Sequence, residues 1–370
     1  MQEPEKRLTT LPHIMIDLKN NQVLIVGPSW IGDMVMAHSL FKLLCNIDKH
    51  VEITVLAPAW SRTLLERMPE VKRSIELPFA HGELKIRQRR KFARQLKGQF
   101  DTVIILPNSF KSALIPFFAG ISERIGWQGE FRNLLLTDCR KLEPTSYPLM
   151  VQRFIALGLE AGVELDFEIP KPKLVSNRRD AIRTVESLGL NYTKRVLIIC
   201  PGAEFGESKQ WPESHYARLC KLAIQDNWQV WIIGSDKDRL VARKIRRQLE
   251  VKIKDSCSDI TGQTSLGQAI DLMSLASMVV SNDSGLMHIA AAVGSPVVAL
   301  YGSTSPDFTP PLAERVKSVT TEISCRPCFQ RSCPLGHKRC LTEISADRVY
   351  IELNQLLDLA DTGVSSSCEY

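Results

Sequence analysis

Residues 22–33 read QVLIVGPSWIGD, an apolar run that leads into a loop with two glycines. Helical periodicity follows over Met34–Cys45, and further apolar runs stand at Val51–Leu56 and Thr102–Leu106. Short apolar strands that alternate with helices favour a parallel sheet covered by helices on both faces. The first half of the chain is therefore predicted to be an α/β domain.

The same alternation starts again in the second half of the chain. Strands are expected at Arg195–Cys200, Gln229–Ile233, Met278–Ser281 and Pro296–Leu300, and helices at Pro212–Gln225, Arg239–Gln248, Ser265–Leu275 and Leu286–Val293. The length of 370 residues also exceeds what one hydrophobic core usually serves. The predicted fold class is α/β, with two Rossmann-like domains that are each built on a parallel sheet.

The boundary between these domains is expected at Phe167–Val175, which contains Pro170 and Pro172 and shows little periodicity. We expect an N-terminal domain over residues 1–170 and a C-terminal domain over residues 171–345. Residues 346–370 are expected to form a helix and a disordered, serine-rich tail. The sequence leaves open whether that helix packs on its own domain or crosses back to the first one.

Composition and charge exclude several classes of protein. The net charge of +6 is a small basic excess that does not by itself indicate a nucleic-acid partner. The best apolar run, Ile289–Tyr301, is too short to span a bilayer. Met1–Lys19 carries charges of both signs and lacks the apolar stretch of a secretory signal. We therefore expect a cytoplasmic protein.

The loop Gly27–Asp33 is a candidate site because ligands bind at the carboxyl ends of parallel strands. Its glycine spacing is that of a phosphate-binding loop, but Asp33 and Met34 stand where such a loop has its lysine and hydroxyl. One interpretation makes Asp33 a general base that acts on a hydroxyl. The other makes it a helix cap, a position that aspartate often occupies.

Two loops of the second half carry further candidates. Pro201–Pro212 is long for such a connection and contains Lys209, either a point charge for a pyrophosphate or a solvated surface residue. Ser281–His288 leads into an alanine-rich helix, whose first N–H groups and dipole favour an anion. Asp283 is expected to bond a sugar hydroxyl or to cap this helix, and His288 to donate to the same anion.

Three other segments carry further candidates. Tyr301–Pro311 is rich in hydroxyl groups and either lines the same site or forms an ordinary proline-rich turn. Asn108 and Lys111 follow an expected strand and are candidates for binding an acceptor. The predicted helix Gly82–Lys97 has seven basic side chains and no acid from residue 85 onward. These side chains form a solvated face or contact an anionic partner such as a phosphorylated lipid.

The cysteines Cys325, Cys328, Cys333 and Cys340 have the spacing C-x2-C-x4-C-x6-C, with His337 between the last two. This spacing is compatible with a structural zinc ion or an iron–sulfur cluster, and equally with free thiols or a disulfide. The other cysteines mostly adjoin apolar segments and are interpreted as buried free thiols.

Several of these stretches together resemble the ADP-heptose:lipopolysaccharide heptosyltransferase family. They are VLIVGPSWIGD (23–33), LPNSFKSAL (106–114), CPGAEFGESKQWP (200–212), NDSGLMHIAAA (282–292) and YGSTSPDFTPP (301–311). The resemblance extends from about Val23 to about Leu357. It implies the GT-B fold, in which two Rossmann-like domains face a central cleft and the C-terminal one binds most of the nucleotide sugar.

The resemblance implies an inverting glycosyltransferase without cofactor or catalytic metal, at the cytoplasmic face of the inner membrane. The implied donor is ADP-heptose, and the implied acceptor is the first heptose of the lipopolysaccharide inner core, in heptosyl-Kdo2-lipid A. Asp33 matches the family's base and Lys209 its phosphate-binding lysine. The family's donor motif matches Asp283, Ser284, Gly285 and His288. One branch of the family has two threonines where Glu204 and Phe205 stand here, and the resemblance implies Glu204 as a donor-binding residue at this position.

Three rival functions stay open at this point. The first is a heptosyltransferase of the same family with a different acceptor. The second is a nucleotide-sugar epimerase on the same fold, which would act on the donor alone. The third is a non-catalytic protein built around a metal held by the cysteine cluster. The sequence assigns no oligomeric state.

Overall fold

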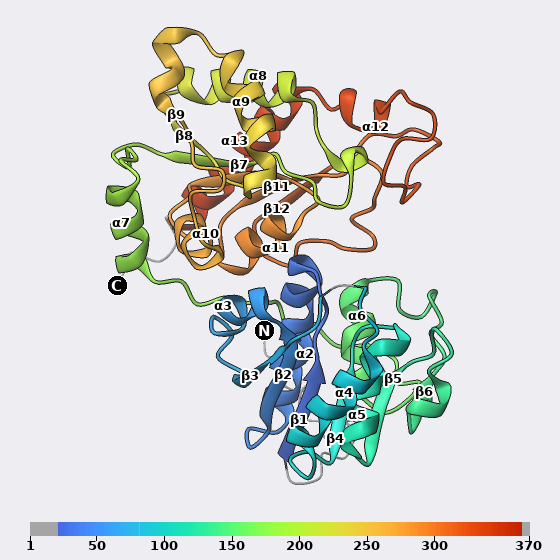
Figure 1. Cartoon of the computed structure of the whole chain (residues 1–370). Coiled ribbons are helices and arrows are strands. Elements are labelled where there is room, and N and C mark those ends of the chain that lie inside the picture. The colour runs from blue at the N-terminus through green and yellow to red at the C-terminus, as the bar shows by residue number, and fades with distance from the viewer. Residues whose placement is uncertain (1–20, 81, 365–370) are drawn as a thin grey trace. The chain divides into compact units, whose positions relative to one another are not determined.

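The computed structural model describes residues 21–80 and 82–364 (Figure 1). The chain divides into two compact units, of which the first ends at Pro172 and the second begins at Lys173. Each unit contains one sheet of six strands, and every strand pair in both sheets is parallel. The predicted alternation of strands and helices is therefore present in both halves of the chain.

The first sheet has the strand order β3-β2-β1-β4-β5-β6. Its strands are β1 (Gln22–Val26), β2 (Glu52–Pro58), β3 (Val71–Leu77), β4 (Thr102–Ile105), β5 (Glu123–Trp127) and β6 (Asp138–Arg140). The sequence pattern missed β3, β5 and β6. These strands lie toward the edges of the sheet and are partly exposed, so they carry charged residues instead of a continuous apolar run.

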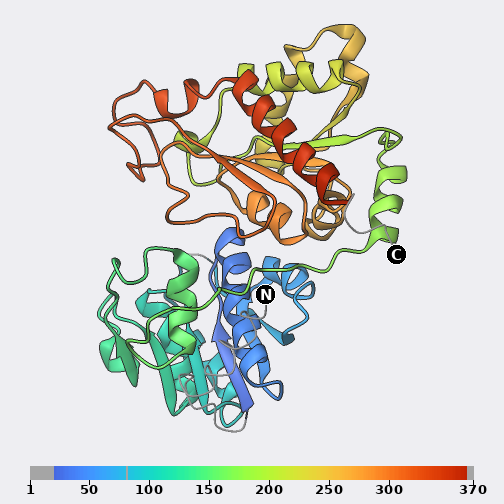
Figure 2. The same ribbon diagram turned by 180° about the vertical axis from the view of Figure 1, so that it is seen from behind.

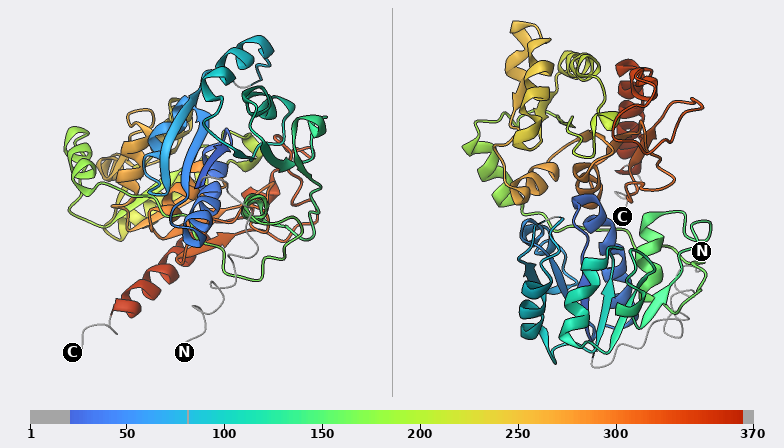
Figure 3. Two further views of the ribbon diagram at one scale, coloured as in Figure 1. Left: turned by 90° about the horizontal axis from the view of Figure 1, so that it is seen from below. Right: turned by 45° about the vertical axis from the view of Figure 1, so that its right-hand side comes forward.

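The helices of the first unit are α2 (Ile31–Ile47), α3 (Arg62–Leu65), α4 (Ile86–Ala93), α5 (Phe110–Ala119) and α6 (Met150–Ile155). α4 and α5 pack together over the face that carries Leu24, Val26 and Ile105, and α2 packs on α6. α6 is shorter than the apolar segment around it and ends in a 3-10 turn at Gly158. Figures 1 and 3 show the helices around each sheet.

The basic helix differs from its prediction in extent and in solvation. It begins at Ile86 instead of Gly82, and Lys85, in the left-handed region, pairs with Glu83 at 2.7 Å. Arg89 is buried, donates to the carbonyls of Glu83 and Leu84, and lies 4.4 Å from the centre of the Phe79 ring. Arg89 therefore anchors the start of α4, while the other basic side chains of the helix stay exposed.

The second sheet repeats the topology of the first, with the order β12-β11-β10-β7-β8-β9. Its strands are β7 (Val196–Cys200), β8 (Gln229–Ile232), β9 (Cys257–Asp259), β10 (Met278–Asn282), β11 (Val297–Leu300) and β12 (Val316–Val319). The order reverses between β7 and β10 here, as it does between β1 and β4 in the first sheet. Open parallel sheets bind ligands beyond the carboxyl ends of the strands at such a reversal.

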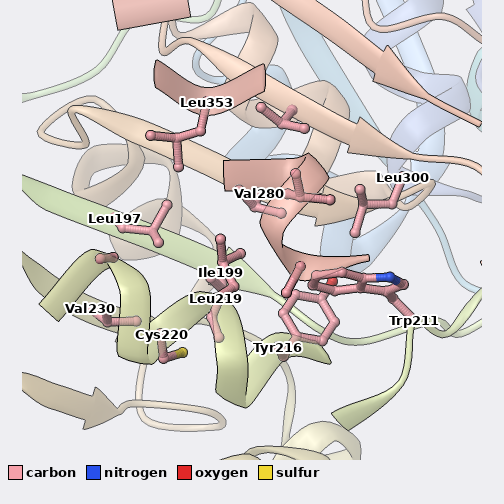
Figure 4. Close-up of a cluster of buried hydrophobic side chains, with 14 of the residues drawn as sticks. Leu197, Ile199, Trp211, Tyr216, Leu219, Cys220, Val230, Val280, Leu300 and Leu353 are labelled. Carbon is pink, nitrogen blue, oxygen red and sulfur yellow. The ribbon is translucent and has the colours of Figure 1, made fainter. Parts of the chain in front are cut away.

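The helices of the second unit are α7 (Arg178–Ser187), α8 (Glu213–Gln225), α9 (Arg239–Arg247), α10 (Leu266–Met273), α11 (Gly285–Ala292), α12 (Arg339–Thr342) and α13 (Ala346–Val364). α8, α9 and α13 contribute to one large core on the sheet, in which Trp211, Tyr216 and Leu353 are buried (Figure 4). α13 packs on α8, β11 and β12 (Figure 2). The apolar face of α13 is therefore buried within the second unit.

Some expectations concern the ends of the chain. Within the part that the structure describes, no helix is both long and apolar enough to cross a membrane. The segment Met1–Lys19, interpreted above as lacking a secretory signal, lies outside the described residues. The helix expected within residues 346–370 is α13, which continues to Val364, and the remaining residues of the expected tail also lie outside the described ones.

Candidate active site

Three loops meet where the strand order of the second sheet reverses. Lys209 stands in the loop after β7, Asp283 follows β10, and Thr304 follows β11. The Nζ atom of Lys209 and the Oγ1 atom of Thr304 each lie 2.6 Å from Oδ2 of Asp283. The Asp283 side chain is 5% exposed and that of Lys209 14%, so this is a nearly buried, charge-assisted cluster.

Asn282 fixes the loop of Lys209 to the end of β10. Its side-chain oxygen accepts hydrogen bonds from the Trp211 backbone N–H at 3.2 Å and from the Tyr216 hydroxyl at 3.0 Å. Its amide group donates to the carbonyl of Pro201 at 2.9 Å. Asn282 is fully buried, so each of these bonds replaces water that cannot reach it. Sequence reasoning named neither Asn282 nor Thr304 as a site residue, because both act through loops distant in sequence.

The start of α11 lies next to this cluster. Ser284 is the N-cap residue, makes no side-chain cap bond, and has its Oγ 3.2 Å from Oγ of Ser281. The first N–H groups of any helix lack an intrahelical acceptor. With Gly285 as the first helical residue, backbone N–H groups and the positive end of the helix dipole adjoin the Lys209 ammonium group. This arrangement favours an anion such as a phosphate.

His288 lies within α11 and is buried. Burial lowers the pKa of His288 to about 4; Asp283 opposes the shift and Lys209 adds to it. The imidazole is therefore neutral near pH 7 and offers an N–H donor without a positive charge. His288 can therefore contribute a hydrogen bond to a bound anion, but not a positive charge.

Glu204 is the donor-binding candidate that this cluster does not include. Its carboxylate is exposed and forms an ion pair with Lys237, and this hydrogen bond raises the pKa of Lys237. The neighbouring Phe205 instead lies beside the site, with its ring centre 4.8 Å from Nζ of Lys209. Phe205 thus contacts the lysine through its ring face, a contact that the sequence did not suggest.

In the first unit, Asp33 lies in the first turn of α2, directly after the glycine loop, and is half-buried. The N-cap of α2 is Trp30, so Asp33 does not occupy the cap position that was the alternative interpretation. β1 pairs with β4, so the loop with Asp33 and the loop with Asn108 follow neighbouring parallel strands. Asn108 is exposed and Lys111 is half-buried.

Arg132 builds the loop that carries Asn108, and sequence reasoning did not find it. It is fully buried and donates to the carbonyl of Trp127 at 3.0 Å through Nε and to Ser112 Oγ at 3.0 Å through Nη1. Nη1 also donates to the carbonyl of Pro107, and Nη2 lies 3.4 Å from Oδ1 of Asn108. Burial lowers the pKa of Arg132 to about 10. Nothing in the local sequence distinguishes this arginine from an exposed one.

The cysteine cluster lies next to the loops that carry Lys209 and Thr304. The four thiols, together with His337, Ser208 and Ser303, line a cavity of about 20 Å³. As the side chains stand, no three His, Cys, Asp or Glu residues of the described chain form a group that could hold a metal ion. Cys325, Cys328, Cys333 and Cys340 are free thiols in the structure, and the first three are partly exposed.

Comparisons with known proteins show the family to which the chain belongs. Residues 89–339 match the family model described as glycosyltransferase family 9 (heptosyltransferase). Lipopolysaccharide heptosyltransferase 2 of Escherichia coli is 42% identical over 342 residues, which is 91% of this chain and 98% of that protein. Lipooligosaccharide heptosyltransferase 2 of Haemophilus ducreyi is 42% identical over 351 residues, covering 91% and 99%.

A solved structure shows the same similarity in three dimensions. The structure of E. coli ADP-heptose lipopolysaccharide heptosyltransferase II matches this chain with a TM-score of 0.83 and 40% identity, over 92% of this chain and 99% of that one. The predicted resemblance and the predicted fold class, with two parallel sheets as in GT-B enzymes, are both confirmed. This protein is a glycosyltransferase, and the chain belongs to glycosyltransferase family 9, the heptosyltransferases.

Proposed function

We propose that this protein transfers L-glycero-D-manno-heptose from ADP-heptose to the first heptose of the lipopolysaccharide inner core, with inversion at the anomeric carbon. The similarity to heptosyltransferases 2 over nearly the whole chain supports the reaction. The observation that carries the site is the cluster of Lys209, Thr304 and Asp283 beside the start of α11. This cluster offers a cation and backbone N–H groups to a diphosphate at the reversal of the sheet.

The donor step follows from the groups at hand. The Lys209 ammonium has three N–H donors and gives one to Asp283, so two stay available for phosphate oxygens. As the bond between the anomeric carbon and the phosphate oxygen breaks, ADP leaves with the electron pair and negative charge grows on that oxygen. Lys209 and the N–H groups after Ser284 stabilise this charge, which is the role of a divalent ion elsewhere. Asp283 then holds Lys209 in position.

The acceptor step belongs to the first unit. Asp33 takes the proton from the acceptor hydroxyl, whose oxygen attacks the anomeric carbon from the side opposite the leaving ADP. Asn108 and Lys111 bind the acceptor, and Arg132 holds the Asn108 loop in shape. The exposed basic side chains of α4 and of the short turn after it contact phosphorylated lipid at the cytoplasmic face of the inner membrane; they are Arg87, Arg90, Lys91, Arg94 and Lys97.

The test is transfer from ADP-heptose to purified heptosyl-Kdo2-lipid A with EDTA present, followed by ADP release and product mass. A mass gain of one heptose is expected, at a rate that EDTA does not change. Transfer only to Kdo2-lipid A without heptose would contradict the proposed acceptor. Donor turnover without transfer to either acceptor would contradict the proposed reaction and favour an epimerase.

A further inference from the structure

The segment between β12 and α12 has no regular secondary structure over residues 320–338. Connections of this length without helices or strands are uncommon and usually have a function. Its large apolar side chains do not form a core of their own, since Phe329 is 45% exposed and Leu335 is 62% exposed. The segment is therefore held by what it contacts, and its contacts include two loops of the donor site.

The first set of contacts reaches the loop that carries Thr304. Nη2 of Arg326 donates to the Thr304 carbonyl at 3.0 Å, and Nε donates to the Gly302 carbonyl at 3.3 Å. Nη1 of the same guanidinium lies 3.4 Å from the carbonyl of Thr321, within its own segment. The backbone N–H of Phe329 donates to the carbonyl between those two, that of Ser303, at 2.8 Å. The backbone on both sides of Ser303 is thus fixed from outside.

The second set of contacts reaches the loop that carries Lys209. The backbone N–H of Ser208 donates to the Arg331 carbonyl at 3.2 Å, and its hydroxyl donates to the Gln330 carbonyl. Lys338 forms an ion pair with Glu207 at 2.6 Å. The same Ser208 hydroxyl lies 3.0 Å from Oγ of Ser303, so the two donor-site loops also touch each other.

Two more observations show how closely this segment fits the Lys209 loop. A Cβ atom at Gly206 would collide with the backbone of Arg331, so this position requires glycine. The Phe205 ring lies close to two cations, with its centre 4.8 Å from Nζ of Lys209 and 5.4 Å from Cζ of Arg331. Lys209 is therefore in contact with both the Phe205 ring and the Asp283 carboxylate.

We propose that residues 325–331 form a brace that sets the positions of Lys209 and Thr304 about Asp283, and that Arg326 is the positioning residue of this brace. The inference rests on the proposed function, because it concerns the site assigned to the donor diphosphate. Arg326 acts through the backbone of Gly302 and Thr304 and does not itself contact the reacting atoms. Its planar guanidinium spreads three donors over three carbonyls, which a lysine cannot reproduce.

The test compares Arg326→Lys and Arg326→Gln with a matched control, Arg348→Gln. Arg348 is exposed and donates to the Thr320 carbonyl at 2.9 Å, next to Thr321, without touching either donor-site loop. Both Arg326 variants are expected to raise the KM for ADP-heptose and the Kd for ADP about tenfold, as the loss of hydrogen bonds from a charged donor does. The KM for the acceptor should stay near that of the wild type, and Arg348→Gln should match the wild type throughout.

A double-mutant cycle on ADP affinity gives a second measurement, and a general loss of protein stability would not produce the same result. Ser208→Ala removes the hydroxyl that links the brace to the Lys209 loop, and it should also weaken ADP binding. If both residues belong to one brace, the effects of Ser208→Ala and Arg326→Gln on ADP affinity are not additive. Ser208→Ala also keeps the test open if an Arg326 variant does not fold.

Several outcomes would overturn the brace. They are ADP affinities of both Arg326 variants equal to that of Arg348→Gln, full recovery by Arg326→Lys, or strictly additive effects in the cycle. If the proposed function were wrong, the result would differ from these outcomes, because the wild-type protein itself would transfer no heptose. ADP binding, measured by calorimetry, still tests the brace in that case.

Discussion

The ammonium nitrogen of Lys209 lies 2.6 Å from Oδ2 of Asp283, although the two residues are 74 positions apart in the chain. The pair forms because β7 and β10 are neighbours in the sheet, so the loops at their carboxyl ends meet. Thr304 donates to the same oxygen from the next strand along, β11. The loops after three neighbouring strands of one sheet thus contribute one side chain each to a single cluster.

Replacing Lys209 with methionine should lower kcat/KM about a hundredfold or more, because the cation that stabilises the leaving phosphate is lost. ADP binding should weaken as well. Lys244→Met is the control, since Lys244 also pairs with a carboxylate, that of Glu213 at 3.0 Å, but on the surface. Steady-state kinetics and ADP titration measure both effects. Equal activities of the two variants would contradict the role of Lys209.

Asp33→Asn should lower kcat by a factor of about 10² to 10⁴, the range for loss of a general base, while ADP affinity stays unchanged. The reason is that Asp33 belongs to the first unit and is assigned to the acceptor hydroxyl alone. Asp48→Asn, at the other end of α2, is the control for changes to this helix. An equal loss of ADP affinity in Asp33→Asn would instead assign the residue a structural part.

His288 should make the folded protein less stable in mild acid. Its pKa of about 4 in the folded state lies below the ordinary value of 6.5, so between these pH values the unfolded chain binds a proton that the folded chain does not. Stability therefore falls as the pH drops from about 6.5 to about 4, by roughly 3 kcal/mol in total. Urea unfolding across this range should show a weaker pH dependence in His288→Gln. An unchanged dependence would show that other groups cause it.

Arg132→Met should destabilise the first unit by about 3 kcal/mol, because buried carbonyls that now accept hydrogen bonds lose their donor. ADP affinity should not change, since the donor cluster lies in the second unit. Arg73→Met, which removes an exposed arginine bonded to Gln99 at 2.9 Å, is the control and should unfold like the wild type. An equally stable Arg132→Met would show that methionine packing compensates for the lost bonds.

The sequence predicted most of the scaffold of this site correctly. The strands Gln22–Val26, Val196–Cys200 and Met278–Asn282 are buried on both faces, and such strands are continuous apolar runs that stand out in a sequence. The edge strands Val71–Leu77 and Asp138–Arg140 alternate or mix polar residues and were missed. The candidate side chains were found because polar groups follow the apolar runs directly.

The contacts between these loops were not predictable in the same way. The bonds from Arg326 to Gly302 and Thr304 and from Ser208 to Gln330 join segments whose local patterns contain no sign of one another. The helix Gly82–Lys97 was predicted with a uniformly charged face, but packing against Phe79 buries Arg89. An arginine in a sequence does not reveal whether carbonyls from elsewhere will surround its guanidinium group.

The sequence by itself determined the α/β class, the division into two repeated halves and the loops that carry Asp33, Lys209 and Asp283. Those features follow from local periodicity and from the glycines and prolines that end each element, which act over a few residues. The tertiary structure decided that Lys209, Thr304 and Asp283 form one cluster and that His288 is neutral. It also decided that residues 325–331 contact the loops that carry Lys209 and Thr304. These outcomes depend on which strands become neighbours and on how deeply each group is buried, and both are settled only when distant parts of the chain pack together.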